Sequence, residues 1–370
     1  MGKGRSVIQR RKPVFALWLG LFLAFPAHAI AAVPAWVSPK EAIGPNLARF
    51  QQGKKELTDR EKEEIKKYGY TGLEVMTYVD SNRETRGKPD YTIYHRCLNV
   101  TARGGNIRAS GILQKYKFYY PGYTARMKQE GIKPGDVEYR VISLLTSPAE
   151  TKGDTTMKTF YLAAPGYRKD SDNWQYSKKT RKVTRSVVAK RQDEGMMITT
   201  RDDDEGREPW EEEHRILGED VYKGQACLVV ESIHWIVKNY YLSRRITWVE
   251  KTNFLDLHEE QFDRQGILFK ILEKDWFQVR PSNYWFPRET NSIKFPSGRR
   301  TIHQTPIYMV HEGAIKEKDD YNMQGIRKQV PWVEVDGVLP PVTGFASIPP
   351  EPQPRLEFWE KMGIKVQVKQ

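Results

Sequence analysis

The side chains that could do chemistry are spread along the sequence without the spacing that a catalytic or metal site requires. Seven histidines are present, and apart from His28 near the amino terminus they stand singly, with no HExxH or other metal-ligand spacing. Those six are His95, His214, His234, His258, His303 and His311. No GxSxG elbow and no glycine-rich phosphate loop occurs either. We therefore expect a protein that is not an enzyme and that uses no metal and no cofactor.

Two groups of carboxylates are the remaining candidates for a chemical site. Glu259 and Glu260 are adjacent in a strand-like segment, where neighbouring side chains point to opposite faces, so they do not form an acid–base pair. Residues 201–213 form an acidic, turn-rich run that could supply oxygen ligands to calcium, but its spacing fits no EF-hand loop. We expect this acidic loop to be solvated and dispensable for folding.

The amino-terminal residues have the three parts of a secretory signal. Five cations and no acid occupy the first twelve residues, a short apolar run extends from Val14 to Phe25, and Ala27-His28-Ala29 follows. The apolar run is shorter than the roughly 20 residues that span a bilayer. We expect cleavage near Ala29 and export to the periplasm, since no later segment is apolar for long enough to anchor the chain.

The net charge bears on the expected partner, and the two cysteines bear on whether the chain contains a disulfide. Removing residues 1–29 lowers the formal net charge from +13 by five, so the mature chain remains basic at +8, which suits an anionic membrane surface or an acidic partner. Nucleic acid is not expected as a partner, because the chain is exported and has no recognised binding motif. Cys97 and Cys227 could pair in an oxidising compartment or could each be buried as a free thiol.

The elements that would position any site are mostly strands. A capping box at Thr58-Asp59-Arg60-Glu61 predicts a short helix towards Lys67, and a second helix is expected from Gly72 to about Asp80. From Tyr91 onward, aromatic and β-branched runs alternate with turn signals, which predicts about a dozen antiparallel strands. The paired runs are 91–102 with 107–120, 137–146 with 156–163, 174–176 with 182–189, 225–237 with 243–249, 254–262 with 267–277, and 284–295 with 300–310. A barrel or wrapped sheet is therefore favoured over a parallel α/β fold.

Alternation within the strands predicts one apolar and one wetter face. In 137–145 the odd positions include Val137, Tyr139, Val141 and Leu145, whereas the even ones begin with a glutamate and an arginine. The apolar face must be covered by the curvature of the sheet, by the two amino-terminal helices or by a ligand. After Trp332 the chain becomes proline-rich and is expected to lie as an extended tail over the surface.

An ordered series of segments resembles a known family. The series comprises Leu145-Thr146-Ser147-Pro148-Ala149 to Gly153, Trp174-Gln175-Tyr176, Arg181-Lys182-Val183-Thr184-Arg185, Leu217-Gly218-Glu219-Asp220, Gly224 to Ser232 and Arg245 to Lys251. In this order and spacing, over roughly residues 72–332, they resemble the outer-membrane lipoprotein-sorting-like proteins, relatives of the LolA lipoprotein carrier. The sequence departs from the pattern at Met196-Met197-Ile198, before the acidic run.

The resemblance implies an incompletely closed antiparallel β-barrel with helices covering its mouth and a hydrophobic cavity for acyl chains. Together with the amino-terminal signal, the capping box and the proline-rich end, it divides the chain into four expected parts, which are a signal peptide (1–29), an extension with a short helix (30–71), the barrel domain (72–332) and the tail (333–370). Together with strand alternation, it predicts that the cavity is lined by Tyr139, Val141, Leu145, Phe160, Leu162, Trp248, Phe269 and Ile271.

The expected function is that of a periplasmic carrier of lipid or lipoprotein acyl chains that serves transport to the outer membrane. The resemblance implies an RND-type or other inner-membrane lipid exporter as the partner, with transient membrane contact. Two alternatives stay open, which are an outer-membrane β-barrel and a secreted hydrolase with a dispersed site. Against the first, the strands carry charges on both faces, as at Arg244-Arg245 and Glu259-Glu260.

Overall fold

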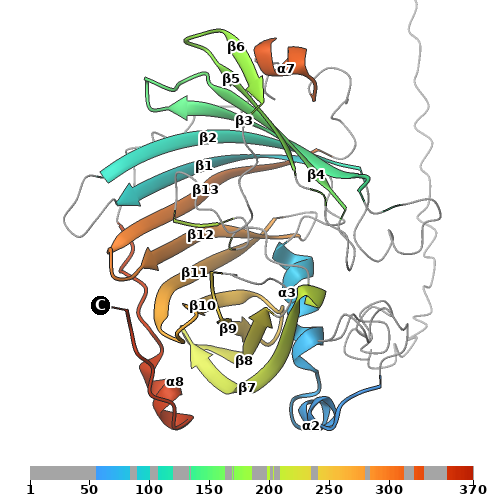
Figure 1. The fold of residues 1–370 in the computed structure, drawn as a ribbon, viewed down its shortest axis with the longest axis vertical. Helices are drawn as coiled ribbons and strands as arrows, with labels where there is room; N and C mark the ends of the chain where they lie inside the picture. The colour runs from blue at the N-terminus through green and yellow to red at the C-terminus, as the bar shows by residue number, and fades with distance from the viewer. Residues whose placement is uncertain are drawn as a thin grey trace, which may run out of the picture. The chain divides into compact units, whose positions relative to one another are not determined.

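The computed structural model describes residues 56–83, 90–100, 107–119, 133, 135–162, 169, 171–185, 198–200, 203, 209–234, 241–279, 284–311, 321–328 and 348–369. The predicted signal peptide lies outside these described residues. Within them, thirteen strands form one antiparallel sheet (Figure 1). They are β1 (Asp90–Val100), β2 (Ile107–Phe118), β3 (Val137–Ser147), β4 (Thr155–Tyr161), β5 (Asp172–Ser177), β6 (Lys182–Arg185), β7 (Glu212–Tyr222), β8 (Gln225–His234), β9 (Arg244–Glu250), β10 (Asp256–Phe262), β11 (Leu268–Val279), β12 (Tyr284–Lys294) and β13 (Arg299–His311).

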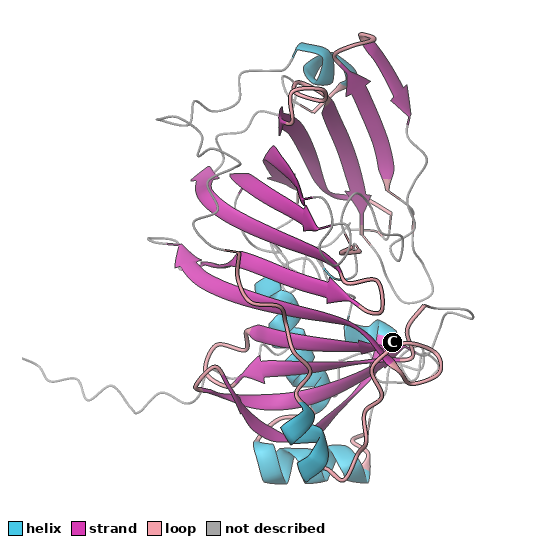
Figure 2. Ribbon diagram, turned by 90° about the vertical axis from the view of Figure 1, so that its left-hand side faces the viewer, coloured by secondary structure: helices cyan, strands magenta, loops and turns pink. Residues whose placement is uncertain are grey.

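The sheet is an incompletely closed antiparallel barrel, as predicted. Its strand order is β6-β5-β4-β3-β2-β1-β13-β12-β11-β10-β9-β8-β7, so β1 pairs with β13 and the sheet ends at β6 and β7. Figure 2 shows the strands side by side in one curved, twisted sheet. The predicted pairs of runs correspond to β1–β6 and β8–β13 within a few residues at each end. No helix in the described part of the chain is long and apolar enough to cross a bilayer.

Strand β7 is the element that the sequence pattern missed. Its first residues, Glu212 and Glu213, end the acidic run that we expected to be a loop. Glu212, His214 and Ile216 nevertheless alternate as the buried positions of the strand. Two of these three buried side chains are polar, so the strand lacks the apolar alternation by which strands are recognised.

Two helices precede the sheet where they were predicted. Helix α2 (Asp59–Tyr68) begins with the complete capping box, in which Thr58 and Glu61 exchange side-chain and backbone hydrogen bonds. It ends at Gly69, whose φ of 84° is the left-handed conformation that glycine adopts without strain. Helix α3 (Gly72–Arg83) follows and packs Val75, Met76 and Val79 against β7, β8 and β9.

Two faces of the sheet are distinguished by the helices that cover them. We call the face that carries α3 the inner face, and the face that carries α7 (Met323–Lys328) and α8 (Leu356–Lys361) the outer face. Figure 1 shows α3 and α8 on opposite sides of β7–β10. Residues in direct register that follow the inner face are Val230, Thr247, Glu259, Leu272, Ser292, Thr301 and Asn99.

The predicted surface tail is wrong for the last part of the chain. Phe358 and Trp359 of α8 are buried in the largest apolar cluster, and both rings pack edge-on against Trp248. Trp359 Nε1 donates to Glu260 at 2.7 Å, and Val368 forms a parallel bridge with Leu268. The carboxyl-terminal segment is therefore part of the core on the outer face.

Cys97 and Cys227 are both buried as free thiols, which resolves the alternative left open by the sequence. Cys97 is on β1 and Cys227 is on β8, and β13, β12, β11, β10 and β9 lie between these strands in the sheet. Burial raises the pKa of the Cys227 thiol to about 11.

Candidate functional site

Four aromatic side chains form a continuous row across strands β1–β4, which we call the aromatic row: Tyr91, Tyr116, Tyr139 and Phe160. The ring centroids of Tyr91 and Tyr116 are 4.5 Å apart, those of Tyr116 and Tyr139 are 6.3 Å apart, and those of Tyr139 and Phe160 are 4.4 Å apart. All three pairs are stacked. Tyr91 with Tyr116 and Tyr139 with Phe160 are in direct register, whereas Tyr116 and Tyr139 are diagonal neighbours on β2 and β3, because Tyr116 pairs with Val141.

The aromatic row lies on the inner face of the sheet. Alternation along β1 places Tyr91 on the same inner face as Asn99. Register then pairs Tyr91 with Tyr116 on β2, and Tyr116 with Val141 on β3. On the same strands, Ile142 and Met157 alternate with the row and pack on the outer face against Ile326 of α7. Tyr91 and Phe160 are buried, whereas Tyr116 and Tyr139 are half-buried.

The structure places the eight predicted lining residues in three different surroundings. Tyr139, Val141, Leu145 and Phe160 share the inner face of β3 and β4, and Leu162 is buried just after β4. Trp248 and Ile271 lie on the outer face in the cluster of α8. Phe269 packs with Tyr241 and Leu242. Trp248, Ile271 and Phe269 thus belong to clusters that contain no residue of the aromatic row.

Alternation alone could not assign the face in β9 and β11, because the inner face of these strands mixes charged positions with apolar ones and the outer face is apolar as well. Arg245, Gln261 and Lys270 are in direct register across β9, β10 and β11 on the inner face. All three are almost completely buried. Ile246, Trp248 and Ile271 point outward instead, where α8 and the carboxyl-terminal segment cover them. The apolar face of these strands is therefore the outer one.

The inner face of β9–β11 carries a network of buried ion pairs that the sequence did not predict. Lys270 Nζ donates to the carboxylate of Asp203, which also accepts from Gln261 and from the backbone N–H of Thr200. Arg245 pairs with Glu212 and lies 3.6 Å from Glu259. Buried charges persist only when they are paired and hydrogen-bonded, and each of these has an opposite charge beside it.

Lys274 extends this network along β11. Its Nζ is 2.8 Å from a carboxylate oxygen of Asp256 and 3.5 Å from the backbone oxygen of Asp203. The expectation of a solvated acidic loop is thus wrong for Asp203 and Glu212, which are 2% and 1% exposed. The reason is that Arg245, two strands from Glu212 in the sheet, and Lys270, 67 residues after Asp203 in the chain, neutralise them.

His214 and His258 are held by neighbouring side chains and backbone groups. His214 lies between Ser232 Oγ and the Pro209 carbonyl oxygen, each 2.8 Å away, so Nε2 donates to the carbonyl and Nδ1 accepts from the hydroxyl. His258 packs between the rings of Tyr222 and Trp248, with Nε2 at 3.4 Å from Glu260.

Two further histidines face each other across β1 and β13. The ring centroids of His95 and His303 are 6.5 Å apart, and His95 Nδ1 is 3.1 Å from Thr305 Oγ1. Desolvation lowers the pKa of His95 to about 4. Desolvation, and then the repulsion from His95, lowers the pKa of His303 to about 3. Both rings are therefore neutral at pH 7.

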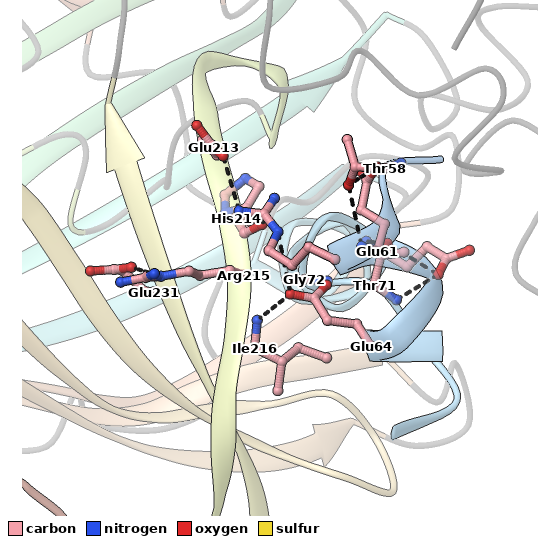
Figure 3. A network of polar contacts seen from close by, with 12 residues as sticks. Thr58, Glu61, Glu64, Thr71, Gly72, Glu213, His214, Arg215, Ile216 and Glu231 are labelled. Atoms are coloured by element: carbon pink, nitrogen blue, oxygen red, sulfur yellow. Dashed lines mark hydrogen bonds and ion pairs between the residues drawn. The ribbon is translucent and has the colours of Figure 1, made fainter. Parts of the chain in front are cut away.

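The corner between α2 and α3 is fastened to β7 by backbone-directed hydrogen bonds (Figure 3). Glu64 accepts from the N–H groups of Gly72 at 2.9 Å and Ile216 at 3.0 Å, and desolvation raises its pKa. Arg60 donates to Glu213 at 3.0 Å and to the His214 carbonyl at 3.3 Å. A Cβ on Gly72 would lie 2.8 Å from the backbone nitrogen of Arg215, so only glycine fits there.

A small pocket lies beside this corner, between α3 and the inner face. Its cavity volume is about 10 Å³, and it is lined by Met76, Val79, Asp80, Pro209, Glu212, His214 and Arg245. Among the residues that the structure describes, no group of three or more His, Cys, Asp or Glu side chains is placed to hold a metal ion. The aromatic row lies on the inner face outside the cluster against which α3 packs.

Comparison with solved structures identifies the architecture. A domain described as an outer membrane lipoprotein-sorting protein from Vibrio parahaemolyticus superimposes with a TM-score of 0.53 at 17% identity, covering 69% of this chain and 98% of that one. A DUF1329 family protein from Desulfovibrio piger superimposes with a TM-score of 0.54 at 17% identity, covering 73% of this chain and 100% of that one. The chain has the lipoprotein-sorting-like fold.

The lipoprotein-sorting-like fold was the one predicted from the ordered sequence segments, and it is confirmed by these two structures. A family model described only as an uncharacterized protein matches residues 138–313, somewhat less than half of the chain. No curated protein matches the sequence. At 17% identity the structural likeness establishes the fold and leaves the ligand to be argued from the inner face itself.

Proposed function

We propose that this protein is a carrier that binds the acyl chains of a lipid or lipoprotein on the inner face of its barrel, along the aromatic row. The observation that carries the proposal is the continuous stacking of four rings over β1–β4. The row lies in a fold shared with a domain described as a lipoprotein-sorting protein. Ligand sites of this kind are concave and mainly apolar, with few polar groups.

The aromatic row is long enough to bury several methylenes of an acyl chain. Four neighbouring strands place the first and last rings about 14 Å apart, at about 4.8 Å per strand. Each methylene removed from water contributes about 0.8 kcal/mol, so eight methylenes along the row contribute about 6 kcal/mol. That energy corresponds to a dissociation constant of tens of micromolar, which suits a carrier that must also release its cargo.

The inner face of β9–β11 is unsuited to acyl chains. Its charges are paired with one another, and an acyl chain laid over Lys270 and Arg245 would have to displace Asp203 and Glu212. Displacing either acid would leave a buried cation without its partner, which costs several kcal/mol. The cargo is therefore placed over β1–β4 and away from this network.

We place the carrier in the periplasm on the strength of the amino-terminal signal, between an inner-membrane lipid exporter and the outer membrane. The positive first twelve residues, the short apolar run and Ala27-His28-Ala29 support this location. Transport towards the outer membrane fits a protein that covers apolar cargo while it crosses water.

The first test is extraction of the purified protein with organic solvent, followed by mass spectrometry of the extract. We expect a co-purifying lipid or acylated peptide in near-stoichiometric amount. A fluorescent fatty acid should then be displaced from the purified, delipidated protein by that same species. A preparation that yields no lipid and binds no fluorescent fatty acid would refute the carrier proposal.

The second test locates the site with matched variants. Tyr116→Glu and Tyr139→Glu each place a carboxylate at a half-buried position of the row, and we expect at least a 30-fold weaker binding of the fluorescent fatty acid. Leu144→Glu is the control, because Leu144 is half-buried on β3 and alternates with the inner positions. It should bind within twofold of the unmodified protein. If the Tyr116 and Tyr139 variants bind normally while remaining folded, the row is not the site.

A further inference from the structure

The turn of the hairpin formed by β5 and β6 carries four exposed cations close together in sequence. Lys178, Lys179, Arg181 and Lys182 are all exposed and lie within five consecutive residues. No acid occurs between Ser177 and Arg185, and no ion pair joins these four cations to a carboxylate of the described residues. Arg185, the next cation, is paired with Asp172 and is not counted with them. We call the four residues the cationic tip.

The cationic tip is held in a defined place. The Arg181 N–H donates to the Ser177 carbonyl at 2.7 Å and closes the turn, with Arg181 in the left-handed conformation at φ 55°. The Lys178 N–H donates to Asp154 at 2.8 Å, which fastens the tip to the turn between β3 and β4. On that neighbouring turn Asp154 adds one negative charge beside the tip, whereas exposed Glu150 and Lys152 offset each other, so the four cations outnumber the acids at this corner. The positive charge therefore projects from a fixed corner of the barrel.

The position of this corner relates it to the proposed cargo site. β6 is one of the two ends of the sheet, and β4, two strands away, carries Phe160 of the aromatic row. Strand β7 at the other end is fastened by Glu64, which accepts from the Ile216 N–H, and by Arg355, which donates to the Val221 carbonyl. The cationic tip thus marks the end of the barrel that lies nearer the row.

We propose that the cationic tip is a docking surface for an anionic lipid bilayer. Lysine ammonium groups are flexible, strongly hydrated point charges that attract a diffuse anionic surface without needing a shaped counterpart. Single-stranded nucleic acid would call for aromatic side chains among the cations, and between Lys178 and Arg185 the sequence has none. The choice of a membrane as the anionic partner rests on the proposed carrier function, whereas the site itself rests on the surface charge.

The expected effect follows from the number of cations. Each lysine or arginine near an anionic membrane surface improves partitioning by about fivefold, so four together give roughly 10³-fold at low salt. The field decays within about 10 Å at 0.1 M salt, so binding should weaken steeply as salt is raised. Only the tip needs to approach the membrane for this attraction to act.

The experiment is sedimentation of the full mature chain with vesicles, without added cargo. Vesicles of phosphatidylethanolamine and phosphatidylglycerol should bind the protein, and phosphatidylcholine vesicles should not. The variant in which Lys178, Lys179, Arg181 and Lys182 are all changed to glutamine should lose at least 100-fold in partitioning. Its control changes Lys66, Lys67, Lys361 and Lys365 to glutamine, because these four lysines are also exposed and their substitution removes the same formal charge. The control should lose less than fivefold.

Equal losses in the two variants would overturn the proposal, because net charge rather than the tip would then drive binding. Binding to phosphatidylcholine vesicles that survives the tip substitutions would overturn it as well, as would tip-dependent binding to heparin but not to vesicles. Fluorescent fatty-acid binding is measured on the same variants. A tip variant that leaves fatty-acid binding intact but loses the vesicles separates membrane docking from cargo binding, so each can fail alone.

Discussion

Replacing Lys270 with methionine removes the positive partner of Asp203 and tests whether the inner charges of β9–β11 act as a buried network. Lys270 is 0% exposed and Asp203 is 2% exposed, so the substitution leaves a carboxylate in the interior with only Gln261 and the Thr200 N–H as donors. Breaking a buried pair by removing one partner costs about 3–5 kcal/mol. We expect the free energy of unfolding, measured by urea denaturation, to fall by that amount.

The paired substitution is the more discriminating measurement. Asp203→Asn with Lys270→Met removes both charges and keeps similar volumes, so the double variant should be at least 2 kcal/mol more stable than the sum of the two single losses predicts. The Asp172–Arg185 pair, whose arginine side chain is 61% exposed, is the reference, and Asp172→Asn should cost less than about 1 kcal/mol. A loss below 1 kcal/mol for Lys270→Met, or purely additive losses, would refute the buried network and restore the solvated acidic loop.

Two further predictions concern the helical corner and the histidine pair. Gly72→Ala should lower the free energy of unfolding by about 1–3 kcal/mol, because the added Cβ would lie 2.8 Å from the Arg215 backbone. Gly218→Ala is the control and should cost much less, because no atom lies nearer than 3.9 Å to its Cβ position. Equal effects of the two substitutions in urea denaturation would contradict the close approach at Gly72. His95 and His303 have folded pKa values of about 4 and about 3, below the unfolded value near 6.5. The unfolded chain therefore binds more protons as pH falls below about 6.5, and stability falls with it, by about 2 kcal/mol per histidine at pH 5. Comparing urea denaturation at pH 7 and pH 5, the doubly substituted His95→Gln, His303→Gln protein should lose about 4 kcal/mol less than the unmodified chain; parallel losses would show that these rings titrate normally in the fold.

Local features of the fold were readable from the sequence because they depend on neighbouring residues. The capping box at Thr58 and Glu61 predicts helix α2, since both of its hydrogen bonds close within three residues. The turn signals between paired runs predict twelve of the thirteen strands for the same reason. Alternation in 137–145 also predicts that Tyr139 and Val141 share one face, which register confirms.

The tertiary structure alone decided which face is inside and which charges are buried. Trp248 and Ile271 alternate as apolar residues should, but Phe358 and Trp359, about a hundred residues further along the chain, cover them on the outer face. Asp203 and Glu212 belong to an acidic run in the sequence. In the folded chain they are paired with Lys270 and Arg245, and these ion pairs offset the energetic cost of burying the carboxylates. Alternation of period two distinguishes two faces of a strand without saying which partner covers either, because that partner comes from a distant part of the sequence.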